Sequence, residues 1–182
     1  FTDAFIIAVT GSNGKTTTAT LIYHILKNAG LNVGLAGNIG VSFASSVCDY
    51  SYDYYVLEVS SFQLDHSITF KPNISVITNI SPDHLDRYDE DFDLYTLSKY
   101  SIVKNQKPND FFIYNNDCNV TKKIFSRVQI KSKSISFSTK QNSGLKHSIY
   151  ANNKNIISSI NKEKFMLSTD KIQIKGIHNI QN

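Results

Sequence analysis

A turn with two glycines, placed between an apolar segment and a helix-forming one, constrains this chain more than any other feature. Residues 5–10 (FIIAVT) have the composition of a buried strand, and residues 17–28 have the periodicity of a helix. Between them, residues 11–16 (GSNGKT) direct several backbone N–H groups and a helix N-terminus toward one point. A phosphate-binding loop is therefore expected, and the alternative is an ordinary glycine turn with a capping threonine.

Two side chains of this loop suit a nucleotide. Lys15 offers a mobile cation, and the Thr16 hydroxyl can bind Mg²⁺. The loop is two residues shorter than the usual pattern, whose first glycine would fall at Val9 instead of Gly11. The helix that follows places its apolar residues on one face: Leu21, Ile22, Ile25 and Leu26.

Apolar runs alternate with helical patterns along most of the chain. Further strands are expected at 32–36, 54–59, 73–80 and 111–114, and a second long helix at 91–104. This alternation predicts an α/β fold with a mostly parallel sheet and helices on both faces, and with the glycine loop after its first strand the sheet resembles that of P-loop NTPases. After about Ser132, short segments ending with KFMLS and KIQIKG predict an antiparallel β-meander that extends the sheet.

Polar side chains follow two of the predicted strands. Glu58 ends an apolar strand, where a carboxylate is costly unless it meets a cation, so it is a candidate Mg²⁺ ligand. Past the next strand, the segment DHLDRY gathers acids, an arginine and His84, which we interpret as a metal or substrate ligand. Asp86 and Arg87 can simply pair with each other. An edge glutamate in solvent is the alternative for Glu58.

Charge, cysteine content and hydropathy argue against a nucleic-acid-binding, disulfide-rich or membrane-spanning protein. The net charge of +4 comes from scattered lysines, which favours neither a nucleic-acid nor a membrane partner. Cys48 and Cys118 lack metal-ligand spacing and fit a reducing compartment, so a cytoplasmic location is expected. No apolar run approaches the roughly 18 residues of a membrane span. Because the first residues already belong to a strand, we expect residues 1–182 to be a single domain cut from a longer, monomeric protein.

Five motifs occur in the order and spacing found in the central, ATP-binding domain of the Mur ligases, which this chain resembles. They are GSNGKTT, GNIG at 37–40, LEVSSFQLD at 57–65, DHLDRY at 83–88 and GIHNIQN at 176–182. The short loop is shared with the folylpolyglutamate synthetases. The combination of SSFQL with GNIG is most similar to the D-glutamate-adding branch of the family, whereas the diamino-acid-adding relatives usually have a His after the paired serines.

The resemblance implies a role for each matching residue. The phosphates of ATP would be held by the loop, which comprises Gly11, Ser12, Asn13, Gly14, Lys15, Thr16 and Thr17. Asn179 and Asn182 would approach the adenine, and Asn38, Ser60, Gln63 and His84 the muramoyl substrate. Two Mg²⁺ ions would be bound by Thr16, Glu58, His84 and a carbamate on Lys99. Lys15, His84 and Lys99 would be the catalytic residues.

The implied activity is ATP-dependent ligation in bacterial peptidoglycan precursor synthesis. The carboxylate of UDP-N-acetylmuramoyl-L-alanine would attack the γ-phosphate to give an acyl phosphate, which the amine of D-glutamate would then convert to an amide. We expect residues 1–182 alone to bind nucleotide weakly and to form no amide. The alternatives are a Mur-type ligase for another amino acid, a folylpolyglutamate synthetase-like ligase, a P-loop regulatory module and a non-catalytic scaffold.

Overall fold

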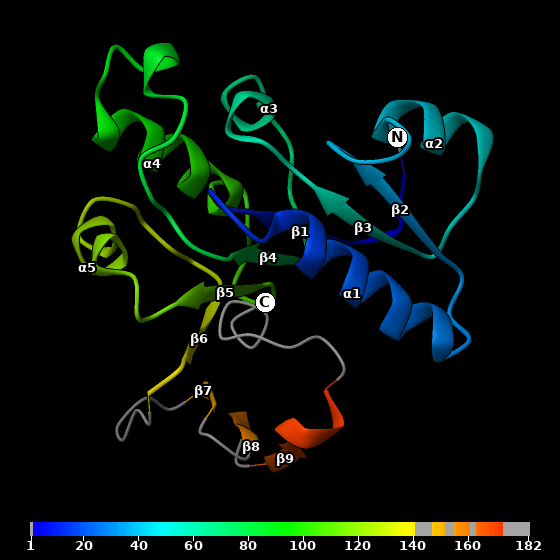
Figure 1. The fold of residues 1–182 in the computed structure, drawn as a ribbon. Coiled ribbons are helices and arrows are strands. Elements are labelled where there is room, and N and C mark those ends of the chain that lie inside the picture. Colours follow the sequence, from blue (N-terminus) through cyan, green and yellow to red (C-terminus); the bar gives the residue numbers. More distant parts are fainter. Residues whose placement is uncertain (1, 141–146, 152–154, 161–162, 173–182) are drawn as a thin grey trace.

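Strands from the whole chain join in one sheet. The computed structural model describes residues 2–140, 147–151, 155–160 and 163–172. Within them the strand order is β2-β3-β1-β4-β5-β6-β7-β8-β9 (Figure 1). The strands are β1 Phe5–Thr10, β2 Val33–Gly37, β3 Tyr54–Glu58, β4 Ile74–Ile77, β5 Phe111–Asn115, β6 Lys133–Ser138, β7 Ser148–Ala151, β8 Asn155–Ile160 and β9 Glu163–Ser168.

Helices follow most of the parallel strands. They are α1 Lys15–Asn28, α2 Phe43–Asp49, α3 Ser61–Asp65, α4 Phe92–Tyr100 and α5 Asn119–Phe125, with 3₁₀ turns η1 Leu85–Arg87, η2 Ser101–Val103 and η3 Thr169–Lys171. No helix among the described residues has both the length and the apolar character needed to cross a membrane. The helices α2, α3 and α5 were not expected, because five to seven residues are too few to reveal a helical period.

The sheet is parallel from β2 to β7, and antiparallel pairing is confined to β7-β8-β9. The mixed α/β prediction is confirmed, but the meander is shorter than expected. The segment 133–138 was wrongly included in it, because α5 crosses over between β5 and β6 and so brings the next strand back parallel. Most of the expected KIQIKG strand lies outside the described residues.

Helices cover both faces of the sheet, as predicted. In β1 the side chains of Ile7 and Val9 join a core with α1, whereas Ala8 joins the core on the opposite face. Of the predicted face of α1, Ile22 and Leu26 pack on the core that α1 shares with β1, whereas Leu21 is not part of this core and Ile25 is 58% exposed. The buried stripe instead runs through Ala19, Ile22, Tyr23 and Leu26, which are three or four residues apart and therefore share one face.

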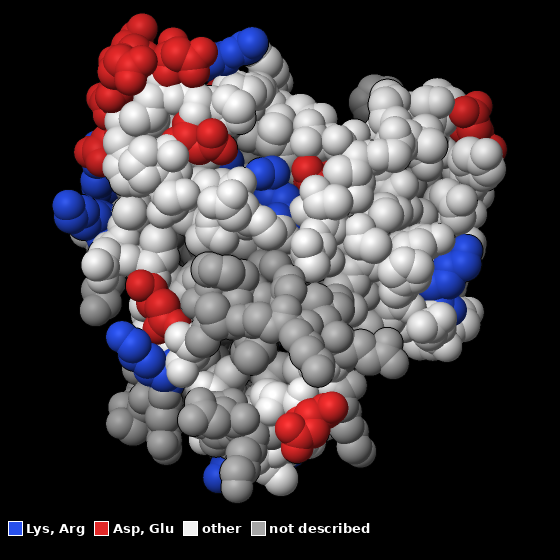
Figure 2. Space-filling model, in the orientation of Figure 1, with Lys and Arg blue, Asp and Glu red and all other residues white. Residues whose placement is uncertain are grey.

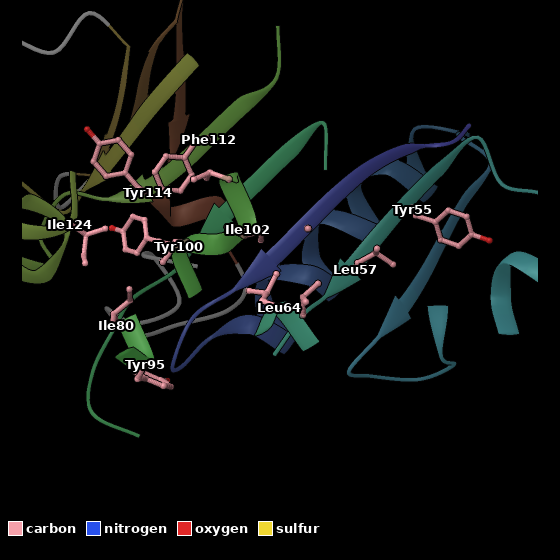
Figure 3. Close-up of a cluster of buried hydrophobic side chains, with 14 of the residues drawn as sticks. Tyr55, Leu57, Leu64, Ile80, Tyr95, Tyr100, Ile102, Phe112, Tyr114 and Ile124 are labelled. Carbon is pink, nitrogen blue, oxygen red and sulfur yellow. The ribbon is translucent and has the colours of Figure 1, made fainter. Parts of the chain in front are cut away.

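The larger core lies between the sheet and the helices α3, α4 and α5. Figure 3 shows aromatic rings of α4 and β5 meeting aliphatic side chains from the neighbouring helices. Tyr95 and Tyr100 of α4, and Phe112 of β5, are almost completely buried in it. This packing holds α4 against the carboxyl ends of the central strands, which matters because α4 carries Lys99.

Charged side chains are unevenly spread over the surface. Figure 2 shows acidic residues gathered at the upper left, the region where the chain leads into α4. Five acidic residues in this segment are exposed: Asp86, Asp89, Glu90, Asp91 and Asp93. The helix predicted at 91–104 is shorter than expected. The α-helix α4 runs from Phe92 to Tyr100, and the chain continues as the 3₁₀ turn η2.

The direction of strand addition changes beside β1. The chain adds β3 and β2 on one side of β1, and β4 with the later strands on the other side. In open α/β sheets, ligands bind outside the carboxyl ends of the strands at such a switch point. Here the switch point lies between the loop after β1 and the loop after β4. The strand predicted at 73–80 ends at Ile77, so Thr78 to Ile80 belong to that second loop.

Candidate functional site

The loop after β1 approaches the loop after β4 too closely for a side chain at its first glycine. Gly11 has φ +150° and Gly14 has φ +80°, and both angles favour glycine. A Cβ atom on Gly11 would overlap the hydroxyl of Thr78 and lie 3.1 Å from the carbonyl oxygen of Asn79. The glycines therefore give the loop its shape, as a loop built around a phosphate requires.

Hydrogen bonds from the β4 loop fix the phosphate-loop backbone. The Ser12 N–H donates to the Asn79 carbonyl at 2.9 Å, and the Asn13 N–H to the Asn79 side-chain oxygen at 3.0 Å. The Thr78 hydroxyl donates to the Asn13 carbonyl at 2.6 Å. The Ser12 hydroxyl donates to the Ser81 carbonyl at 2.8 Å. Sequence reasoning gave Thr78, Asn79 and Ser81 no role, because Thr78 and Asn79 fall in the strand predicted at 73–80 and Ser81 directly follows it.

Helix α1 begins at this loop with free donors. Its N-cap is Gly14, which has no side chain to bond the first-turn N–H groups. The Lys15 ammonium donates to the carbonyls of Gly11 at 2.9 Å and Ser12 at 2.8 Å, so it lies folded over the loop. Thr17 follows in the first turn of α1 and is half-buried. The helix N-terminus and a cation thus face one point, an arrangement that favours an anion.

Glu58 lies beside this point, at the carboxyl end of β3. Its side chain is 2% exposed, and its two oxygens accept hydrogen bonds from the Thr16 hydroxyl at 2.7 Å and the Asn38 amide at 2.8 Å. The parallel pairing of β1 with β3 brings Glu58 to the level of the phosphate loop. Three of the predicted site residues, from three separate segments, therefore meet at one carboxylate.

Lys99 reaches the same loop from α4. It is 3% exposed, its ammonium donates to the Gly11 carbonyl at 3.1 Å, and it lies 4.6 Å from the centre of the Tyr95 ring. Burial, and then the neighbouring Lys15 ammonium, lower the pKa of Lys99 to about 8, while Asp83 and Asp65 act in the opposite direction. The amine of Lys99 therefore loses its proton far more easily than an ordinary lysine.

Tyr95 connects α4 to the phosphate loop as well. Its hydroxyl is 2.8 Å from the Ser12 hydroxyl, and burial raises the pKa of this phenol. We gave Tyr95 no role from the sequence, although it precedes Lys99 by four residues and so occupies the same helix face. That spacing was the one signal that could have found it.

His84 is exposed to solvent, unlike the buried Glu58 and Lys99, and it contacts residues of its own loop and of α3. Its side chain is 62% exposed, and its Nε2 is 3.7 Å from a carboxylate oxygen of Asp83. Its ring meets the edge of Phe62 with the centroids 5.7 Å apart. Among the described residues His84 makes no ion pair with Glu58, and no group of three His, Cys, Asp or Glu side chains could hold a metal ion.

The remaining predicted residues fall into two groups. Ser60 and Gln63 form a capping box at the start of α3, in which the Ser60 hydroxyl accepts from the Gln63 N–H at 3.3 Å and the Gln63 side chain accepts from the Ser60 N–H at 2.9 Å. This arrangement gives both residues a local role besides the predicted substrate contact. Asn179 and Asn182 lie outside the described residues.

The sequence profile of the Mur ligase middle domain matches residues 9–182. The chain belongs to this family. Similar proteins include the UDP-N-acetylmuramoylalanine–D-glutamate ligases of Christiangramia forsetii, 43% identical over 183 residues, and of Bacteroides fragilis, 43% identical over 182 residues. Each match covers 100% of this chain and 40% of the relative. The chain therefore spans less than half the length of the curated relatives that it matches.

Solved structures place the Mur ligase middle domain in the same fold. One neighbour is a UDP-N-acetylmuramoyl-L-alanyl-D-glutamate–2,6-diaminopimelate ligase, with a TM-score of 0.74 and 20% identity over 98% of this chain and 41% of the other. Another is the MurF ligase from Thermotoga maritima in complex with ADP, with a TM-score of 0.65 and 20% identity over 92% of this chain and 40% of the other. At this identity the likeness concerns the fold.

Proposed function

We propose that the Mur ligase middle domain described here is the ATP-binding part of an enzyme that adds D-glutamate to UDP-N-acetylmuramoyl-L-alanine. The observation that carries the ATP site is the meeting of Thr16, Glu58 and Asn38 beside an uncapped helix N-terminus. The D-glutamate specificity is supported by the similarity to ligases of that name. The bacterial cytoplasm is the compartment that we propose for this reaction.

The donors around Glu58 fit a magnesium ion. Glu58 is buried, yet its hydrogen-bond partners are a neutral hydroxyl and a neutral amide, and the ion pairs among the described residues do not include it. A buried carboxylate with no cationic partner favours a divalent cation, and Mg²⁺ prefers hydroxyl and carboxylate oxygens. Thr16 and Glu58 would hold one ion, which would neutralise the charge developing on the phosphates.

A second ion, bound by His84 and a carbamate on Lys99, belongs to the proposal too. An ammonium cannot bind a metal, but the lowered pKa of Lys99 favours the neutral amine, which would add to carbon dioxide and release one proton to solvent. The carbamate that results is an anion with two oxygen atoms. Lys99 donates to the Gly11 carbonyl, so this anion would form next to the phosphate loop.

The residues of this chain would act mainly by alignment and charge. Lys15 and the loop N–H groups that do not bond to Asn79, next to the uncapped first turn of α1, would bind the β- and γ-phosphates and hold the γ-phosphate toward the substrate carboxylate. Attack by that carboxylate on the γ-phosphate would break its bond to the β-phosphate and give an acyl phosphate and ADP, and the amine of D-glutamate would then displace phosphate to form the amide. Asn38, Ser60, Gln63 and His84 are the proposed contacts with the muramoyl substrate, and Asn179 and Asn182 with the adenine.

Nucleotide binding by this chain tests the ATP site. In the Thr16→Val variant the hydroxyl is replaced by a methyl group of similar size, so we expect affinity for ATP in the presence of Mg²⁺ to fall by about tenfold to a hundredfold. Without Mg²⁺, the variant and the wild type should bind ATP alike. Thr20→Val, one turn farther along α1, is the matched control. Equal affinities of both variants for Mg²⁺–ATP would contradict the assignment.

The reaction itself is tested with the full-length ligase. With UDP-N-acetylmuramoyl-L-alanine and ATP present, phosphate release should depend on D-glutamate and should not occur with L-lysine, meso-diaminopimelate or L-glutamate. Release with one of the other amino acids would move the protein to another branch of the Mur ligases. Release with a folate substrate in place of the muramoyl one would favour the folylpolyglutamate synthetase-like alternative.

A further inference from the structure

The loop that carries His84 has an unfavourable backbone. His84, Asp89 and Glu90 have φ angles of 50°, 51° and 58°, and among the described residues they are the non-glycine residues with positive φ. Side chains other than glycine rarely adopt this left-handed conformation, and such strain persists only where surrounding contacts hold it. Contacts with the rest of the domain must therefore hold the loop in this conformation.

Electrostatic repulsion adds to this need. Asp86, Asp89, Glu90 and Asp91 lie within six residues of one another and are exposed. Like charges so close together repel and favour a more open loop. The gathering of acidic residues at this place is visible in Figure 2. Asp91 also caps α4, where its carboxylate is favoured. Backbone strain and the repulsion among Asp86, Asp89 and Glu90 thus both act to release the loop from the body of the domain.

Tyr88, in the middle of the loop, opposes this release. It is 8% exposed, although its neighbours on both sides are exposed. Its hydroxyl donates to a carboxylate oxygen of Asp65 at 2.7 Å and lies 3.2 Å from the hydroxyl of Ser98. The Ser98 hydroxyl in turn donates to the Ser61 carbonyl at 3.0 Å. One phenol therefore joins the loop to both ends of α3 and to the residue before Lys99.

The ring of Tyr88 reaches the same two helices. It stacks on Phe62 of α3 with the centroids 6.1 Å apart, and meets Tyr95 of α4 edge-on at 5.5 Å. Phe62 also contacts the His84 ring at 5.7 Å, and the Arg87 guanidinium lies 4.8 Å from its centre. His84 and Arg87, which the loop exposes to solvent, thus both contact the Phe62 ring, on which Tyr88 stacks.

We propose that Tyr88 is a positioning residue, whose hydroxyl clamps the strained loop to α3 and α4 and so fixes where His84 is presented. The clamp is a property of this chain. Its importance for catalysis rests on the proposed function, because that function gives His84 its role. Tyr88 itself touches none of the reacting groups in this proposal.

Amide hydrogen exchange on this chain tests the clamp without any assay of activity. Tyr88→Phe removes the hydroxyl and keeps both ring contacts, so residues 84–91 should exchange about fivefold faster, as expected from the loss of one hydrogen bond. Tyr55→Phe is the matched control, because Tyr55 is 1% exposed and its hydroxyl accepts from Ser46 far from this loop. The central strands should exchange at wild-type rates in both variants.

Two results would overturn the clamp. One is unchanged exchange of residues 84–91 in Tyr88→Phe. The other is faster exchange throughout the sheet, since that would make Tyr88 an ordinary core residue whose loss weakens the whole domain. Asp65→Ala serves as a second variant that removes the acceptor of the Tyr88 hydroxyl, and should accelerate exchange in the same residues.

Ligation by the full-length protein then tests the link to His84. We expect Tyr88→Phe to lower kcat by about tenfold, with little change in the KM for ATP. Combined with His84→Ala, it should cause no further loss, because the two changes act through one group. Independent, multiplicative losses would contradict this link. If the wild type ligates nothing, the proposed function fails, and hydrogen exchange still decides whether the clamp exists.

Discussion

Replacement of Gly11 by alanine should destabilise the domain more than the same change at another glycine with positive φ. A φ of +150° is a region that residues other than glycine almost never occupy, and the strain amounts to about 1–3 kcal/mol. The new Cβ would also displace the Thr78 hydroxyl from its hydrogen bond to the Asn13 carbonyl, which costs about 1 kcal/mol more. Lower entropy of the unfolded chain offsets about 0.5 kcal/mol. The expected loss in the free energy of unfolding is therefore about 1.5–3.5 kcal/mol.

Gly30 supplies the matched control. Its φ is +81°, but a Cβ there meets no atom within 4 Å, so Gly30→Ala has only the left-handed conformation to oppose it, at about 1 kcal/mol. Urea unfolding followed by circular dichroism measures both variants, since the chain has no tryptophan to report by fluorescence. Stabilisation by Mg²⁺–ATP should disappear in Gly11→Ala and persist in Gly30→Ala. Equal losses of stability would refute the argument that the β4 loop leaves no room at Gly11.

Two further predictions concern Lys99 and Ser60. The pKa of Lys99 is about 8 in the folded chain and 10.5 in its unperturbed state. Between these pH values the unfolded chain binds more protons than the folded chain. The free energy of unfolding should therefore rise from pH 8 to pH 10.5. Urea unfolding without Mg²⁺ or carbon dioxide should show this rise in the wild type but not in Lys99→Met. If the free energy of unfolding rises equally with pH in both proteins, the rise comes from other titratable groups. Ser60→Ala should lose about 1 kcal/mol by removing the cap of α3, whereas Ser60→Asp keeps the cap and should lose little. Equal loss in both Ser60 variants would show that capping is not the reason.

The sequence predicted those parts of the site whose cause is local. The glycines at 11 and 14 and the lysine after them are consecutive residues, so the loop can be recognised without knowing the fold. Glu58 could be predicted because an acidic residue at the end of an apolar strand needs a partner. Its partners turned out to be Thr16 and Asn38, which the resemblance had already placed in the site.

The parts that could not be predicted depend on contacts between distant segments. Thr78 and Asn79 look like the end of a strand, and their bonds to the phosphate loop follow only from the pairing of β1 with β4. In the sequence, Tyr88 is only the last residue of the motif DHLDRY. Its role could not be predicted, because it depends on the contacts of its hydroxyl with Asp65 and Ser98, which lie in other segments. The direction of β6 likewise depended on α5, whose seven residues give no clear helical period.

Two ammonium groups, those of Lys15 and Lys99, share the carbonyl oxygen of Gly11. A carbonyl oxygen has two lone pairs, so both are occupied here. When an incoming anion draws the Lys15 ammonium away, the Lys99 nitrogen, which keeps an N–H even as a carbamate, can stay and keep that peptide group satisfied. The glycine turn can therefore keep the same shape whether empty or filled, and the entropy of ordering it is lost during folding instead of during association.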